Sequence, residues 1–276
     1  MSEREMDALT LTVIWNGIMS IAEELGITLR HTAFSEGVRE GDDFSTAIFD
    51  RDGRMIAQGN FSPGHLGSMP FVAQHVRDYF PEENLSPGDA IALNDSFMGS
   101  GHFPDVFQVM PVFLDGSIIG YVATSAHQVD MGGAAPGSQK VHGVTESYQE
   151  GLRILPVKLV RSGEFDEDIL RIILGNVRMP DKVRGDLAAQ HGANLTAAGR
   201  LCQLHRDHGT EFVERAHDIT SRGDLFGRPE GRRATHIDWR GWPEVVSVRL
   251  RGQRERVDIS EIGATKRGVP RLALGL

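Results

Sequence analysis

Two pairs of histidine and aspartate carry the clearest chemistry in this sequence. His102 and Asp105 form a His-x-x-Asp group, and His127 and Asp130 form a second one 25 residues later. Imidazole nitrogen and carboxylate oxygen together suit a divalent transition metal such as Mn, Fe or Zn. The chemistry therefore depends on whether the fold brings the two pairs together.

The segment between the pairs is typical of a β-hairpin. Two apolar, β-branched runs, Val106–Leu114 and Ser117–Ala126, are separated by Asp115-Gly116. A type I′ turn needs positive φ at both central residues, and Asp-Gly supplies this. Folding at this turn pairs residues whose numbers sum to about 231, so the two His/Asp pairs are expected to meet at the open end. The alternative is that these residues only cap a hairpin.

Four other polar residues are candidates for a site. His65 lies in a Gly/Pro-rich loop without an evident packing role, and Asp43 directly precedes a predicted strand. Asn94 follows a short buried strand, a placement that often presents polar groups to a site. Glu150 is ambiguous, because a surface salt bridge would also explain it.

Composition bounds the protein class. The 276 residues can form one large domain or two small ones, and the net charge of −9 argues against general nucleic-acid binding. The single cysteine, Cys202, excludes an intramolecular disulfide and fits a reducing compartment. The N-terminus lacks an apolar signal core, and no apolar run approaches the roughly 20 residues of a membrane helix. We expect a soluble, cytoplasmic protein.

The periodicities predict an α+β fold, with antiparallel hairpins and short strands in the N-terminal part and a helical segment after them. The predicted helices are Asp7–Leu25, with Gly26 as C-cap, Phe71–Phe80, and two between Glu167 and about Asp218 that Met179-Pro180 separates. Besides the central hairpin, the predicted strands are Phe44–Phe49 and Arg54–Gln58 around an Asp52-Gly53 turn of the same type, Ala90–Leu93 and Ile154–Leu159.

Charge divides the chain near residue 220. Residues 221–276 hold 12 Lys+Arg against 7 Asp+Glu, whereas the rest has a balance of −14. We therefore expect an N-terminal region at 1–220 and an Arg-rich, poorly defined tail at 221–276. Within the tail, Val245–Leu250 and Arg256–Ile259, joined through Gly252, could form a hairpin.

Several motifs in order resemble the hydantoinase B/oxoprolinase family. They are TAFSEGVREGDDFSTAIFDRDGRMIAQGNFSPGHLGSMP, NDSFMGSGHFPDV, AHQVDMGG, PGS and YQEGLRILPVKL, within about residues 8–220. The family includes N-methylhydantoinase B subunits, the corresponding half of 5-oxoprolinase, and acetone carboxylase alpha subunits.

The resemblance implies an ATP-dependent enzyme of two kinds of subunit. A hydantoinase A-type partner would bind ATP and phosphorylate the substrate, which fits the absence of G-x-x-x-x-G-K-[ST] and G-x-G-x-x-G motifs here. This chain would complete the opening of a hydantoin or 5-oxoproline ring within a hetero-oligomer. The alternative in the same family is carboxylation of a ketone, as by an acetone carboxylase alpha subunit.

The resemblance also assigns roles. Acetone carboxylase alpha subunits carry Mn on a His-x-x-Asp pair and a later His, which fall on His102, Asp105 and His127. Mn is therefore the expected metal, with Zn or Fe as alternatives. Asp130 is expected to orient His127 without binding the metal itself. The expected substrate-positioning or proton-moving residues are His65, Asp43, Asn94 and Glu150.

Family members typically continue for about as long again beyond the end of this chain. The sequence thus predicts a truncated or frameshifted reading frame, and a non-catalytic fragment is a second alternative. A third is a stand-alone metal-dependent hydrolase that works without ATP.

Overall fold

The computed structural model describes residues 8–65, 67–99, 101–140, 142–221, 245–250 and 253–258. The chain divides into two compact units, Met1–Gly227 and Arg228–Leu276. In the second unit β8 (Val245–Leu250) pairs with β9 (Gln253–Asp258) as an antiparallel hairpin. The hairpin that the tail sequence suggested is therefore present.

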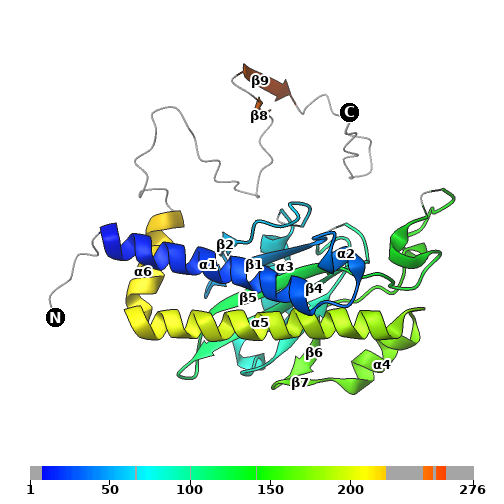
Figure 1. Ribbon diagram of the computed structural model, residues 1–276, viewed down its shortest axis with the longest axis horizontal. Helices are drawn as coiled ribbons and strands as arrows, with labels where there is room; N and C mark the ends of the chain where they lie inside the picture. The colour runs from blue at the N-terminus through cyan, green and yellow to red at the C-terminus, as the bar shows by residue number, and fades with distance from the viewer. Residues whose placement is uncertain are drawn as a thin grey trace. The chain divides into compact units, whose positions relative to one another are not determined.

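The first unit is built on one antiparallel sheet of seven strands, in the order β2-β1-β5-β4-β3-β6-β7 (Figure 1). The α+β fold expected from the sequence is confirmed. The strands are β1 (Phe44–Asp50), β2 (Met55–Gln58), β3 (Ala90–Leu93), β4 (Asp105–Leu114), β5 (Ser117–His127), β6 (Val157–Arg161) and β7 (Glu164–Phe165).

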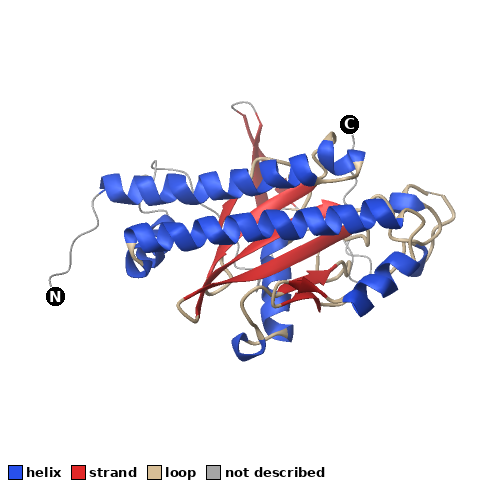
Figure 2. Cartoon of the chain, turned by 60° about the horizontal axis from the view of Figure 1, so that its bottom comes forward, coloured by secondary structure: helices blue, strands red, loops and turns tan. Residues whose placement is uncertain are grey.

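Helices cover both faces of this sheet. Two long helices, α1 (Ala8–Thr32) and α5 (Pro180–His208), lie side by side over one face (Figure 2). On the other face α3 (Met69–Tyr79) buries Val72 and Val76 against the sheet. The remaining helices are α2 (Glu36–Arg39), α4 (Glu167–Gly175) and α6 (Thr210–Ser221), with single 3₁₀ turns η1 (Glu82–Asn84), η2 (Pro136–Ser138) and η3 (Ser147–Gln149).

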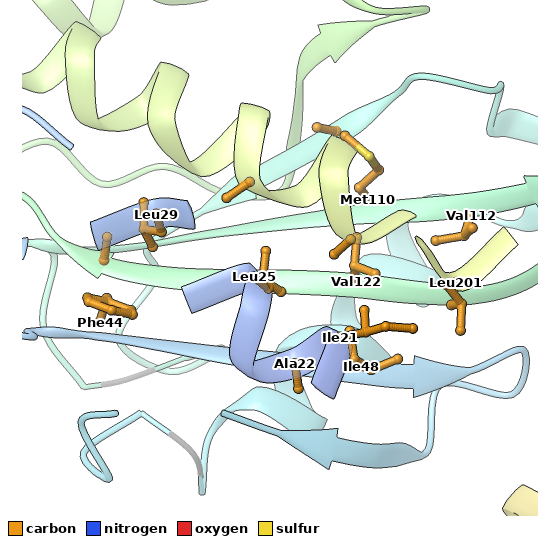
Figure 3. Close-up of a cluster of buried hydrophobic side chains, with 14 of the residues drawn as sticks. Ile21, Ala22, Leu25, Leu29, Phe44, Ile48, Met110, Val112, Val122 and Leu201 are labelled. Carbon is orange, nitrogen blue, oxygen red and sulfur yellow. The ribbon is translucent and has the colours of Figure 1, made fainter. Parts of the chain in front are cut away.

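The larger core lies between the two long helices and the sheet. Leu25 and Leu29 of α1 and Leu201 of α5 meet Ile48 of β1 and Val122 of β5 there (Figure 3). At about 25 cal/mol per Å² of apolar surface removed from water, burial of this kind is the main stabilising term. It fixes the sheet on which the polar residues stand.

The first helix is longer than the sequence predicts. It continues through Gly26, the expected C-cap, to Thr32. Gly26 instead allows the Phe61 ring to pack against the helix backbone, because a Cβ atom at this position would overlap that ring. A close approach, not a helix end, explains this glycine.

The central hairpin forms as predicted, with a change of register near its turn. Asp115 and Gly116 both have positive φ, as a type I′ turn requires. A β-bulge then places one extra residue, Ile119, on β5, since Val112 faces Gly120 and Phe113 faces Ile118. Beyond the bulge, paired residue numbers differ by one from the predicted register.

Two other strand predictions need correction. The hairpin of β1 and β2 is present, but its turn is not type I′: Gly53 has positive φ whereas Asp52 does not, and Gly53 N–H bonds to Asp50 O. The strand expected at Ile154–Leu159 begins later, at Val157. Ile154 instead pairs its backbone with Asn94, ahead of the strand.

A buried layer of amide side chains joins α5 to the sheet. Gln190 Nε2 donates to Val106 O at 2.9 Å, and Asn194 Nδ2 lies 3.3 Å from Thr124 Oγ1. Both α5 residues are fully buried. Within the described residues, the helices are too short or too polar to span a membrane.

Candidate metal centre

Three histidines converge on the buried carboxylate of Asp105. His102 Nε2 and His65 Nε2 lie 2.8 and 3.0 Å from Asp105 Oδ2, and His127 Nδ1 lies 3.1 Å from Oδ1. The Asp105 side chain is only 4% exposed, and His65 is buried almost as completely. Both carboxylate oxygens are thus surrounded by imidazole nitrogens.

The sheet register positions this cluster. Asp105 is the first residue of β4 and His127 the last of β5, and the bulge described above makes them direct partners. Direct partners present their side chains on one face of the sheet. Asp43, the residue before β1, also approaches His127: its carbonyl accepts His127 N–H at 3.0 Å, and its Oδ2 lies 3.9 Å from His127 Nδ1.

A serine fixes the orientation of His65. Ser45 Oγ donates its single proton to Ser62 O at 2.6 Å, so in its 3.1 Å contact with His65 Nδ1 it accepts the imidazole N–H. A neutral His65 would then turn the lone pair of Nε2 toward Asp105. A cation or a proton between them removes that repulsion, so the arrangement fits a bound metal ion.

The charges of the cluster favour cation binding. Burial alone would raise the pKa of the Asp105 carboxyl, but hydrogen bonds with His102, His127 and His65 hold it well below its usual range. The hydrogen bond with Asp105 raises the pKa of His102 against the opposing effect of burial, and the charges of Asp105, Glu150 and Asp43 add to the rise. Asp105 is therefore ionised at any physiological pH.

Three of these residues have the geometry of a metal site. One ligand atom each from His102, Asp105 and His127 lies within 4.8 Å of the other two. Two imidazoles and one carboxylate match the donors that Mn, Zn and Fe accept. Their solvent exposure differs: Asp105 is buried, and both histidines are partly exposed. A substrate could therefore approach from the histidine side.

Asn94 and Glu150 are adjacent to this cluster and support its loop. Asn94 Nδ2 donates to Phe103 O at 2.7 Å and to Leu152 O at 2.9 Å, and Asn94 Oδ1 accepts Ile154 N–H at 2.6 Å. These bonds attach the loop that carries His102 to the segment 152–154. Glu150 Oε2 accepts Phe103 N–H at 3.4 Å, which places this carboxylate beside the same loop.

Asp130 lies in a different set of contacts from the one we expected. Its Oδ1 accepts Gly132 N–H at 2.9 Å and Arg178 Nη1–H at 3.0 Å, and its Oδ2 accepts Arg178 N–H. Arg178 also donates to the carbonyls of Gly132 and Gly133. Asp130 and Arg178 thus hold the loop that contains Gly132 and Gly133 to the α4–α5 connection, and the carboxylates beside His127 are Asp105 and Asp43.

Sequence reasoning did not single out Ser45 or Arg178. Ser45 lies two residues after Asp43 on β1, so a strand period of two would have placed both on one face. The missing information was that β1 pairs with β5, which no local pattern indicates. Arg178 lies in a short connection, and nothing in its sequence context distinguishes it from a solvated arginine.

Comparisons with known proteins identify relatives of this chain. Residues 7–222 match the Hydantoinase B/oxoprolinase family. The beta subunit of the caprolactamase of Pseudomonas jessenii is 34% identical over 224 residues, covering 81% of this chain and 38% of the relative. The 5-oxoprolinase PfmaA of Pestalotiopsis fici is 35% identical over 215 residues, covering 73% of this chain and 16% of the relative.

Solved structures agree with these sequence matches. The crystal structure of the ATP-dependent caprolactamase from Pseudomonas jessenii superposes with a TM-score of 0.71 at 31% identity, covering 78% of this chain and 37% of that one. A nucleotide-free acetone carboxylase gives a TM-score of 0.70 at 19% identity, with 78% of this chain and 29% of that one covered, and so shares the fold.

The chain spans 16% and 38% of the length of the two curated relatives named above. The matched range, residues 7–222, includes every residue of the cluster around Asp105. On this evidence the chain belongs to the hydantoinase B/oxoprolinase family.

Proposed function

We propose that this chain is the B-type component of an ATP-dependent enzyme that opens a cyclic amide in a metal-assisted step. The observation that carries the proposal is the convergence of His102, Asp105 and His127 within 4.8 Å, in a family whose relatives include 5-oxoprolinase and caprolactamase. ATP would bind to a hydantoinase A-type partner, since two of the relatives are named as single components of larger enzymes, one of a hydantoinase and one of a caprolactamase.

The charge and solvent exposure of each residue indicate its role in the reaction. A divalent metal on His102, Asp105 and His127, with Mn our first choice and Zn or Fe the alternatives, would supply a Lewis acid for a carbonyl group. Asp105 stays ionised and would hold the cation, while Ser45 fixes His65 with its Nε2 3.0 Å from Asp105 Oδ2. Asp43 and Glu150 border the partly exposed histidines and are the carboxylates that can accept a proton from the substrate.

The sequence identities to known relatives favour cyclic amide hydrolysis over ketone carboxylation. The relatives named for amide-ring substrates are 30–35% identical to this chain. The acetone carboxylase likeness, at 19% identity, supports a shared fold and not a shared substrate.

The test combines metal analysis with a reconstituted reaction. We expect about one Mn, Zn or Fe per purified wild-type chain, and ATP-dependent ring opening of hydantoin, 5-oxoproline or caprolactam when a hydantoinase A-type partner is added. His102→Ala should lose both metal and turnover. The matched control is His142→Ala, which replaces an exposed histidine outside the cluster.

Two results would contradict the proposal. One is full metal occupancy in folded His102→Ala protein, which would exclude the assigned ligands. The other is ring opening at the same rate without ATP or partner, which would instead identify a stand-alone hydrolase.

A further inference from the structure

Two of the candidate metal ligands, Asp105 and His127, lie where the pairing of strands ends. Asp105 begins β4 and His127 ends β5, and the pairing of β3 with β4 stops at Phe107. Among the described strands, the first two residues of β4 therefore pair with β5 alone. Strand ends open more readily than the middle of a sheet. The spacing of the two ligands thus depends on what else holds this end of the hairpin.

Two buried glutamines hold the cross-strand pair next to these ligands. Val106 and Ala126 are direct partners, one residue inside the ligand pair. Gln190 Nε2 of α5 donates to Val106 O at 2.9 Å, and Gln128 Nε2 donates to Ala126 O at 3.5 Å. Gln128 Nε2 also donates to Gln190 Oε1 at 3.3 Å. The two amides together connect both carbonyls of this pair.

The two glutamines act from the face of the sheet opposite the candidate metal centre. Successive residues of a strand point to opposite faces. Val106 and Ala126 lie in the larger core beneath α5, so the ligands that flank them along the strands point to the other face. Gln190 and Gln128 are thus not metal ligands themselves. An effect of these glutamines on the metal must pass through the backbone of the two strands.

Packing alone does not explain a glutamine at position 190. The side chain is fully buried, and burying an amide costs free energy unless its polar atoms are paired. Both the amide nitrogen and the amide oxygen of Gln190 are paired. Within the part of the chain that the structure describes, the buried amide oxygens of Gln108, Gln128 and Asn194 have no hydrogen-bond partner. Gln190 is therefore the most completely paired amide of this layer, and it bonds the carbonyl next to Asp105.

We propose that Gln190 is a positioning residue for the metal centre. With Gln128 it closes the end of the hairpin, and this sets the spacing of Asp105 and His127 on the opposite face of the sheet. The inference rests on the proposed function, which places a metal on these ligands. It adds a residue of α5 that acts on them without contacting the metal or the substrate.

Matched substitutions within one buried layer of the full-length protein test this role. Gln190→Met keeps the approximate volume of the side chain and removes all of its hydrogen bonds. The control, Asn194→Leu, does the same one turn further along α5, where Asn194 bonds Gln108 O and Thr124 Oγ1. Gln108 and Thr124 are a cross-strand pair three positions from the ligands. Both variants should lose stability in urea, because both lose buried hydrogen bonds.

Only Gln190→Met should alter the metal centre. We expect its Mn²⁺ affinity to fall roughly 10- to 100-fold, the range for losing a group that orients a metal ligand. The electron paramagnetic resonance spectrum of the bound Mn²⁺ should change as well, whereas Asn194→Leu should keep both. In metal-free protein, the N–H of residue 128, which bonds to Pro104 O, should exchange roughly tenfold faster in Gln190→Met and not in Asn194→Leu.

The inference would be overturned by unchanged exchange at residue 128 in Gln190→Met, by faster exchange that leaves Mn²⁺ affinity and spectrum unchanged, or by equal changes in both variants. If Gln190→Met does not fold, Gln128→Met removes the contact between the two amides from the other side and should give the same changes. A wild-type chain that binds no Mn, Zn or Fe would overturn the metal centre. Hydrogen exchange would then still decide whether Gln190 holds the end of the hairpin.

Discussion

Replacing Asn94 with alanine should separate the support of the site from its chemistry. The Asn94 side chain is buried, and it joins three backbone groups: Phe103 O, Leu152 O and Ile154 N. All of its hydrogen bonds thus hold the loop that carries His102 against the neighbouring segment.

The cost can be worked from these contacts. Each buried hydrogen bond contributes about 1 kcal/mol net, and a buried group that loses its partner costs about 1–3 kcal/mol. Relaxation and entering water will recover part of this, so we expect Asn94→Ala to lower the free energy of unfolding by about 3–5 kcal/mol. Because Phe103 is next to His102, the Mn affinity should also fall, on the order of tenfold or more.

Urea denaturation and Mn titration measure the two effects. The control is Asn194→Ala, since Asn194 is equally buried and also donates through its amide, but lies in the layer beneath α5. We expect it to lose stability, by about 1–2 kcal/mol, and to keep wild-type Mn affinity in the folded protein.

The reasoning would be refuted by an Asn94→Ala protein with wild-type stability and Mn affinity. Equal loss of Mn affinity in both variants would show that general destabilisation, and not loop support, controls the site. Asn94→Asp sharpens the comparison: it keeps an acceptor for Ile154 N–H but loses the donors to Phe103 O and Leu152 O, so it should not rescue the site.

The remaining predictions concern pH and the loop clamp. Because the pKa of His102 is raised, protons compete with metal above pH 6.5, and Mn affinity measured by calorimetry should weaken steadily from pH 8 to pH 6; a flat profile would contradict this. Burial, and then the proximity of His217, lowers the pKa of His205 from 6.5 to about 4, so stability is complete above pH 6.5 and falls toward pH 4. At pH 5 the loss is up to about 2 kcal/mol, and His205→Gln should remove that part of the pH dependence in urea denaturation. Arg178→Ala removes the cationic partner of the buried Asp130 carboxylate, which keeps its two backbone hydrogen bonds, and should cost about 1–3 kcal/mol, of which Asp130→Asn in the same chain should recover part; no recovery would argue against the pair.

Local patterns predicted the elements well where one residue type determines the conformation. Asp115-Gly116 predicted the central hairpin, and Met179-Pro180 predicted the break before α5. Gly26 misled the prediction, because a glycine needed for close packing and one that ends a helix look alike in sequence. Only the position of Phe61 distinguishes the two.

The site was predictable only as far as the hairpin reached. The sequence predicted that His102, Asp105 and His127 meet at the open end of the hairpin, but it did not predict the bulge that places Asp105 opposite His127. His65 and Asp43 were expected near a site. However, the contacts of Asp43 depend on the pairing of β1 with β5, and those of His65 depend on the loop that precedes α3. Apolar periodicity also misses the amide layer of α5, since Gln190 and Asn194 occupy core positions with polar side chains.

The extra residue Ile119 determines which residues of β4 and β5 face each other at the metal centre. If Ile119 were instead paired in the ladder, Asp105 would face Ala126, and its carboxylate and His127 would point to opposite sides of the sheet. This residue lies eight positions from His127, roughly 25 Å along the strand. Over evolutionary time, a one-residue insertion that is paired into either strand should therefore be as harmful as loss of a ligand, whereas deletion of the unpaired Ile119 would keep Asp105 opposite His127. Changes of two residues that preserve the alternation should be better tolerated.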